Sequence, residues 1–236
     1  MTDDLGMKAL GGSLTDRANA SIEAGCEVLL HCSGFLKEPD AILAEILQSK
    51  VIQVDETPIE YLQPGAGATG KGYLWPVLDP MSGAVHYSWR LGRGHEQLVE
   101  ILRLGKPGGF SGIIQCDGFS AYETLAKRYP DIRLGGCLAH IRRKFFESRE
   151  QAAEVVMPIL QSIQQLYRIE ENLRQSGALP GCRELVRAAV SRPIGEELHK
   201  KITTELGSHL PKSNLGKALR YALGQWAGFA RYLENG

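Results

Sequence analysis

Apolar residues follow two different periods along the chain, and the change between them divides it into regions. Short apolar runs bounded by glycine, proline or aspartate are typical of strands, whereas apolar residues that recur every three or four positions are typical of helices. Both patterns occur between residues 51 and 137, and only the helical one continues beyond residue 141. The predicted strands cover residues 51–54, 71–78, 84–90, 112–116 and 132–137, and the predicted helices cover residues 39–49, 95–104, 121–128, 141–148, 150–176, 182–206 and 214–233.

The order of these elements predicts the fold class. Three strands, a helix, a strand, a helix and a last strand are the plan of a ribonuclease-H-like domain, in which the first and fourth strands lie side by side in one mixed sheet. We therefore expect an α/β protein with a ribonuclease-H-like mixed sheet and flanking helices, followed by an all-helical C-terminal region. The expected domains are an N-terminal piece at residues 1–43, with a helix near 15–24 and a strand at 27–32, then a core at 44–148 and a helical region at 149–236.

Two aspartates stand where predicted buried strands end. Asp55 follows Val51–Val54, and Asp117 follows Gly112–Cys116. Carboxylates delivered to one edge of a sheet can hold the two metal ions that polynucleotide-processing enzymes use, and Mg²⁺ (or Mn²⁺) prefers such oxygen ligands. The alternative is that each aspartate only caps the turn that follows, because Asp-Gly and Asp-Glu-Thr-Pro are ordinary turn sequences.

A short segment after the last predicted strand combines a cysteine, a histidine and several basic residues. Cys137 and His140 have the spacing of half a zinc site, but no second pair lies nearby in the sequence, so a packed cysteine and a histidine at the beginning of a helix are an alternative. The candidates for contact with a DNA backbone are His140, Arg142, Arg143 and Lys144. A solvated face of an amphipathic helix would produce the same pattern.

Composition narrows the class of protein further. The 236 residues contain 27 basic and 27 acidic side chains, so no overall charge indicates a nucleic acid or a membrane as partner, although seven basic and two acidic residues fall between Lys127 and Arg149. The five cysteines are scattered, which is typical of reduced thiols. Without a leader sequence or an apolar run of roughly 20 residues, a cytoplasmic protein with no membrane segment is expected.

Five motifs between residues 54 and 223 carry a family resemblance. They are Val54-Asp55-Glu56-Thr57-Pro58, Gly72-Tyr73-Leu74-Trp75, Gln115-Cys116-Asp117-Gly118-Phe119-Ser120-Ala121-Tyr122, Cys137-Leu138-Ala139-His140-Ile141-Arg142-Arg143-Lys144-Phe145-Phe146, and Leu210-Pro211-Lys212-Ser213 with Ala218-Leu219-Arg220-Tyr221-Ala222-Leu223. With these motifs in register over most of the chain, residues from about 44 to 236 resemble the insertion sequence 66 family of DDE transposases.

The resemblance implies that Asp55 and Asp117 are two of three acidic residues that bind Mg²⁺ (or Mn²⁺) for phosphodiester cleavage and strand transfer. It also implies DNA as the partner, both transposon ends and target, and it leaves a homo-oligomer open. In the family the third acid is a glutamate just after a segment that Tyr232-Leu233-Glu234-Asn235-Gly236 begins. Neither Glu234 nor Glu56 lies in that motif, so we expect a truncated and inactive copy whose third acid is missing.

The N-terminal segment has a different resemblance. Residues from about 1 to 35 resemble a fragment of the family 3 β-N-acetylhexosaminidases, in which the residue matching Asp3 would be the nucleophile. Such an enzyme needs a whole barrel and a proton donor, which 35 residues do not provide. The expectation is therefore a fused or interrupted reading frame with a junction near residues 33–44.

The function expected from the sequence is that of a DDE-type transposase of a mobile element, an insertion sequence active in DNA recombination. Two alternatives stay open. A non-catalytic DNA-binding fragment would need only the basic segment, and its affinity would fall with salt. A stand-alone ribonuclease-H-like nuclease would need a third acid of its own.

Overall fold

The computed structural model describes residues 37–62 and 69–234, and the chain divides into two compact units, residues 1–43 and 44–236. The helix expected near residues 15–24 and the strand expected at 27–32 lie outside the described residues. Helix α2 (Lys37–Ile46) is where the helix at 39–49 was predicted, with its end three residues earlier. None of the described helices is long and apolar enough to cross a membrane.

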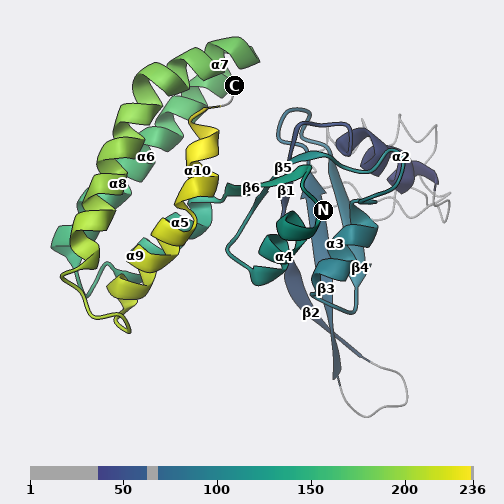
Figure 1. The fold of residues 1–236 in the computed structure, drawn as a ribbon, viewed down its shortest axis with the longest axis horizontal. Helices are drawn as coiled ribbons and strands as arrows, with labels where there is room; N and C mark the ends of the chain where they lie inside the picture. The colour runs from purple at the N-terminus through teal and green to yellow at the C-terminus, as the bar shows by residue number, and fades with distance from the viewer. Residues whose placement is uncertain (1–36, 63–68, 235–236) are drawn as a thin grey trace, which may run out of the picture. The chain divides into compact units, whose positions relative to one another are not determined.

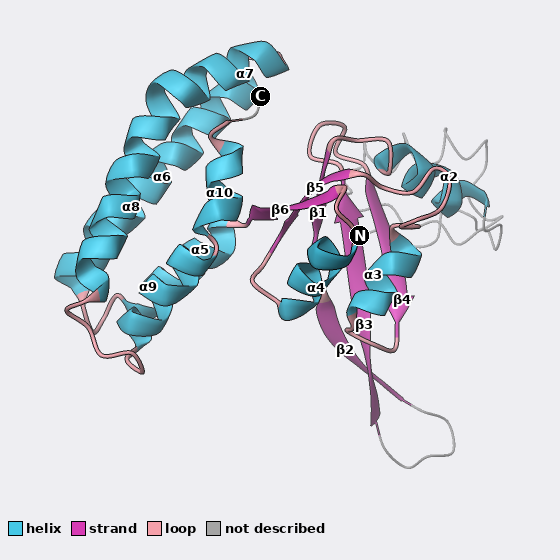
Figure 2. Cartoon of the chain, viewed as in Figure 1, coloured by secondary structure: helices cyan, strands magenta, loops and turns pink. Residues whose placement is uncertain are grey.

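The second unit contains a mixed six-stranded sheet (Figure 2, magenta). Strands β1, β5 and β6 run parallel to one another, while β2, β3 and β4 make the antiparallel part. Strands β1 and β2 pair with one edge of β3, and β4 pairs with the other edge. The order across the sheet is therefore β4-β3-β1-β5-β6, with β2 in line with β1. The strands are β1 (Val51–Val54), β2 (Thr57–Leu62), β3 (Thr69–Leu78), β4 (Val85–Arg90), β5 (Gly112–Cys116) and β6 (Ile132–Gly136).

Strand β2 was not predicted from the sequence, because Asp-Glu-Thr-Pro resembles a turn. It continues β1 after a gap of two residues, and both strands pair with β3 in one register, in which Val54 lies opposite Val77 and Thr57 opposite Leu74. That register puts Asp55 opposite Pro76. The Asp55 N–H donates to the Pro76 carbonyl at 3.5 Å, but proline has no N–H to return the bond. Pro76 therefore interrupts the ladder at Asp55.

Helices α3 (His95–Ile101) and α4 (Ser120–Arg128) contact each other and lie over one face of the sheet (Figure 1). Each buries the apolar residues that gave its helical period, Leu98 and Ile101 in α3 and Tyr122 and Leu125 in α4. Because α3 connects β4 to β5 and α4 connects β5 to β6, these crossover helices allow the last strands to run parallel.

The described residues after β6 are helical, as predicted. One apolar cluster fills its interior, with Ile141 and Phe145, Ile159 and Leu198 among its fully buried members. The helices are α5 (Leu138–Ser148), α6 (Ala153–Gln175), α7 (Pro180–Val186), α8 (Arg192–Leu206), α9 (Asn214–Gly224) and α10 (Trp226–Tyr232), with a π-helical segment η1 (Arg187–Ser191) between α7 and α8.

The helix predicted at residues 182–206 is irregular in its middle. Pro193 has no N–H to donate, and its ring would collide with a carbonyl one turn earlier in a regular α-helix. The wider turn of η1 immediately before α8 relieves that collision. The break that proline predicts is therefore a local widening, and the chain stays helical through it.

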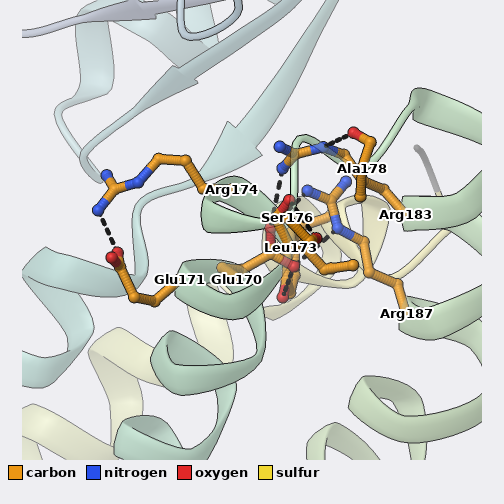
Figure 3. Close-up of polar contacts among 9 residues, drawn as sticks. Glu170, Glu171, Leu173, Arg174, Ser176, Ala178, Arg183 and Arg187 are labelled. Atoms are coloured by element: carbon orange, nitrogen blue, oxygen red, sulfur yellow. Dashed lines mark hydrogen bonds and ion pairs between the residues drawn. The ribbon is translucent and has the colours of Figure 1, made fainter.

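A partly buried carboxylate joins α6 to the η1 segment (Figure 3). Glu170 accepts hydrogen bonds from Arg187 Nε at 2.9 Å and Nη2 at 2.7 Å, and Arg183 Nη1 lies 3.7 Å from Glu170 Oε2. The Tyr232 hydroxyl of α10 donates to the same carboxylate at 2.6 Å. Three helical segments thus share one charged group.

The helical region touches the sheet where strands β5 and β6 end. Helix α10 packs on β6 so closely that a Cβ on Gly136 would lie 2.7 Å from the Gln225 carbonyl oxygen, and one on Gly228 would lie 2.6 Å from the Gly136 nitrogen. The Tyr221 hydroxyl accepts a hydrogen bond of 3.2 Å from the Gly118 N–H. Helices α9 and α10 therefore fix the loop that follows β5.

Candidate functional site

The two aspartates end neighbouring parallel strands. The register of β1 and β5 pairs Val51 with Ile113 and Gln53 with Gln115, an offset of 62 residues that, continued two positions, sets Asp55 beside Asp117. The side chains of Gln53 and Gln115 share a hydrogen bond of 2.5 Å, so residues one pleat earlier already meet on one face of the sheet. The sequence prediction that these strands lie side by side is confirmed.

Each aspartate uses one oxygen for its own loop. Asp55 Oδ1 accepts from the Glu56 N–H at 2.9 Å, and Asp117 Oδ1 accepts from the Phe119 N–H at 2.8 Å. Both contacts are those expected of an aspartate that caps the turn after it, the alternative considered from the sequence. Among the described residues, the second oxygen of each carboxylate accepts no hydrogen bond, and the Asp55 side chain is 53% exposed.

Glu56, next to Asp55, has a different environment. Its side chain is only 1% exposed, and Oε1 contacts Arg93 Nε at 2.7 Å and Nη2 at 2.5 Å. Oε2 accepts a hydrogen bond of 2.9 Å from the Tyr122 hydroxyl. Burial raises the pKa of Glu56, an effect that the Arg93 and Tyr122 contacts only partly offset. With both oxygens engaged, Glu56 is not a free ligand.

Arg93 was missed in the sequence because it lies in a Gly-Arg-Gly turn, where nothing indicates a contact 37 residues away. Its guanidinium carbon lies 3.9 Å from the centre of the Phe119 ring. Burial lowers the pKa of Arg93, but the contacts with Glu56 and the charge of Asp117 outweigh it, so the net pKa is raised. Phe119 in turn meets Tyr122 edge to face. These four residues, Glu56, Arg93, Phe119 and Tyr122, form an ion-pair cluster that joins the segments following the two aspartates.

His140 reaches the same place from the beginning of α5. Its Nε2 lies 4.0 Å from Asp55 Oδ2, and its buried Nδ1 has no hydrogen-bond partner among the described residues. The nearby Cys137 thiol raises the pKa of His140. Burial raises the pKa of Cys137, but His140 and the N–H groups that begin α5 outweigh it, so the net pKa is lowered.

The three other predicted DNA contacts lie along α5. Arg142, Arg143 and Lys144 are exposed, while Ile141 and Phe145 on the same helix are buried. Arg142 lies 5.6 Å from the Phe146 ring, and Lys144 Nζ lies 3.8 Å from Glu147. The structure therefore brings His140 to Asp55 and leaves a basic, solvated helix face next to it.

Asp55 and Asp117 supply the oxygen ligands that a hard cation prefers, but they supply few of them. Two carboxylates with one uncommitted oxygen each are ligands that Mg²⁺ accepts. Among the described residues, no group of three or more His, Cys, Asp or Glu side chains is arranged to hold a metal ion. Asp55 and Asp117 could thus hold part of a coordination shell, and the rest would come from water or from other groups.

Fold and site together define the class of protein. It is an α/β protein with a mixed sheet, two carboxylates at the ends of adjacent strands, and a helical region after the sheet. The sequence family described as "Transposase IS66 family" matches residues 26–236. The chain belongs to this family. The match begins at residue 26, inside the segment compared above with a hexosaminidase, and no comparison supports that second resemblance.

Relatives in Sinorhizobium fredii (strain NBRC 101917 / NGR234) carry the names uncharacterized protein y4qI and y4jD. They are 33% and 29% identical over 211 and 210 residues, in each case 84% of this chain. The chain spans 38% and 40% of their lengths. A cryo-EM structure of the simian T-cell lymphotropic virus intasome with PP2A regulatory subunit B56 gamma is similar at 15% identity and a TM-score of 0.28, covering 63% of this chain and 46% of that one.

Proposed function

We propose that this chain carries part of the catalytic centre of a DDE-type transposase, with Asp55 and Asp117 as two of its metal-binding acids. The observation that carries the proposal is the register of β1 and β5, which puts the two aspartates at equivalent ends of adjacent parallel strands. Membership of the IS66 transposase family supplies the reaction class.

The fold that we infer around these acids is ribonuclease-H-like. Support comes from the strand order, since β1 and β2 act as one interrupted strand and the sheet then reads β4, β3, β1, β5, β6. Crossover helices α3 and α4 occupy the places that such a sheet requires between its last strands. In this arrangement the first and fourth strands are the central pair.

A divalent cation, Mg²⁺ or Mn²⁺, would polarise a phosphodiester and activate the attacking oxygen when bound. The residues of the chain have separate tasks. Asp55 and Asp117 offer their uncommitted oxygens, and their Oδ1 contacts to backbone N–H groups fix each carboxylate. His140 at 4.0 Å from Asp55 helps to orient that carboxylate, and Arg142, Arg143 and Lys144 contact the DNA backbone.

We further infer that this chain alone does not cleave DNA. Two carboxylates give fewer ligands and less charge than three, and Glu56 cannot serve as the third because Arg93 and Tyr122 occupy its oxygens. The expected result is weak cation binding without strand cleavage. The domains that we propose are residues 1–43, 44–148 and 149–236, and both aspartates belong to the second of them.

The test is cation binding measured by calorimetry with Mn²⁺. Asp55→Asn and Asp117→Asn each remove one charge without changing side-chain size, so each should weaken binding at least tenfold, a loss of about 1.4 kcal/mol. Asp131→Asn is the control, because Asp131 is exposed and directly precedes β6, at the opposite end of the parallel strands from the aspartates. Equal Mn²⁺ affinity in all variants would refute the assignment.

Strand cleavage is tested separately, with the same protein, labelled duplex DNA and Mn²⁺. The absence of product is expected. Metal-dependent product that Asp55→Asn abolishes would contradict the inference of inactivity and still support the role of Asp55.

A further inference from the structure

The ion-pair cluster holds Arg93 by one edge. Nε and Nη2, which lie on the same side of the guanidinium, both contact Glu56 Oε1. Its face lies on the Phe119 ring at 3.9 Å. Nη1 contacts none of the described residues, so one end of the group keeps its donors unused.

The exposure of the two charges is unequal. The Glu56 side chain is 1% exposed and the Arg93 side chain 42%. The carboxylate is therefore buried, while the arginine side chain remains accessible to solvent.

Arg93 contacts the segments that follow both aspartates. Glu56 follows Asp55, Phe119 follows Asp117 by two residues, and Asp117 acts electrostatically on Arg93. A planar guanidinium, fixed on one edge and one face, is arranged to receive a second oxyanion at low conformational cost.

We infer that Arg93 binds a phosphate of the DNA strand held at Asp55 and Asp117, with Glu56 and Phe119 as the residues that position it. The ligand class is a phosphodiester. This inference rests on the proposed function, since it takes the two aspartates as the place where the strand lies.

A comparison within the chain separates this arginine from other stacked ones. Arg149 lies over the Phe146 ring at the same distance, 3.9 Å. Its Nη1 donates to the Phe146 carbonyl and its Nη2 to Glu150, which is 82% exposed. Both ends of Arg149 are therefore engaged, and it is a matched control with the same charge and stacking.

The experiment measures binding of a fluorescently labelled DNA duplex to the full chain by anisotropy, at a fixed Mn²⁺ concentration and over a series of salt concentrations. Arg93→Gln keeps a donor for Glu56 and removes the charge. It should lower affinity roughly tenfold and reduce the slope of log K against log salt by about 1, the value for one lost phosphate contact. Arg149→Gln should retain the slope of the unsubstituted chain.

Arg93→Lys is the second variant. It keeps the charge but loses the planar fork, so the slope should stay the same while affinity falls several-fold. This result is interpretable even where Arg93→Gln fails to fold, which thermal unfolding of each variant will show. Lysine binding as tightly as arginine would overturn the inference.

The outcomes distinguish this inference from the proposed function. Arg93→Gln with unchanged affinity and slope, in a chain that binds DNA and needs Asp55 for Mn²⁺, overturns the role of Arg93 alone. A chain that binds no DNA overturns both. Equal losses in Arg93→Gln and Arg149→Gln would indicate a general charge effect and would also overturn it.

Discussion

Adjacent residues in this chain differ in solvent exposure, because the sheet in which their strands end is covered on one face. Asp55 remains half exposed, while Glu56, its neighbour, is buried against Arg93 and Tyr122. The same contrast occurs in α6, where Glu170 is shared by three helical segments and Glu171 pairs with nearby Arg174 at the surface (Figure 3). The type of residue does not decide which carboxylate is structural.

Glu170 gives a pH prediction. Burial raises the pKa of its carboxyl, but hydrogen bonds from Arg187 and Tyr232 outweigh that effect, and the net pKa lies below the ordinary 4.5. The folded state thus favours the ionised form, so this stabilisation is present above pH 4.5 and is lost as pH falls through the lowered pKa.

Glu170→Gln should therefore lower the free energy of unfolding by roughly 1.5–3 kcal/mol at neutral pH, the range for hydrogen bonds to charged groups. The difference from the unsubstituted chain should shrink in acid. Urea denaturation at several pH values measures it. Glu171→Gln, one residue away in an exposed pair, should change stability by less than about 1 kcal/mol at any pH. A pH-independent loss in Glu170→Gln would contradict the ionic role.

At the scale of elements, the contact between β6 and α10 depends on two backbones that approach without side chains. A Cβ on Gly136 would collide with the backbone of Gln225 and Phe229, groups that cannot rotate away as a side-chain end can. Helix α10 could be accommodated only by moving off the strand.

Gly136→Ala should accordingly destabilise the protein by about 1–3 kcal/mol, the usual cost of overpacking. The matched control is Gly224→Ala at the end of α9, where a Cβ would meet nothing within 4 Å. That change should be neutral or stabilising by up to about 1 kcal/mol, because alanine is the better helix former. Thermal or urea unfolding compares the two, and equal stability of both variants would show that α10 does not depend on the close approach.

At the scale of the whole second unit, residues 44–236, the sheet and the helical region share their contacts near the candidate site. Helix α10 packs on β6, Tyr221 holds the Gly118 N–H, and Arg231 donates to the Leu134 carbonyl. These contacts fix the loop after Asp117 from the helical side. The candidate site is thus built by both regions, although the aspartates belong to the sheet.

We expect these regions to unfold as one cooperative unit. Hydrogen exchange under low denaturant should give similar opening free energies for amides of β5 and of α8. In Gly136→Ala, which loosens α10, the two sets should separate, with α8 exchanging first. Separate opening in the unsubstituted chain would contradict the coupling.

The sequence by itself determined most elements and the chemistry they carry. Periodicity predicted five of the six strands, the crossover helices and the helical region, and it set Asp55 and Asp117 at strand ends, because local spacing and turn residues are encoded within a few positions. Family membership followed from motifs of the same local kind. Periodicity did not predict β2, because Asp-Glu-Thr-Pro resembles a turn and the pairing of residues 57–62 with β3 is a contact between strands.

The tertiary structure decided which groups meet. The register of β1 and β5, the Arg93 contact with Glu56, the approach of His140 to Asp55 and the packing of α10 on Gly136 join residues that lie far apart along the chain. Nothing in a local pattern specifies such partners, because their proximity depends on how all elements pack together and exclude water. The same packing left Asp55 open and covered Glu56.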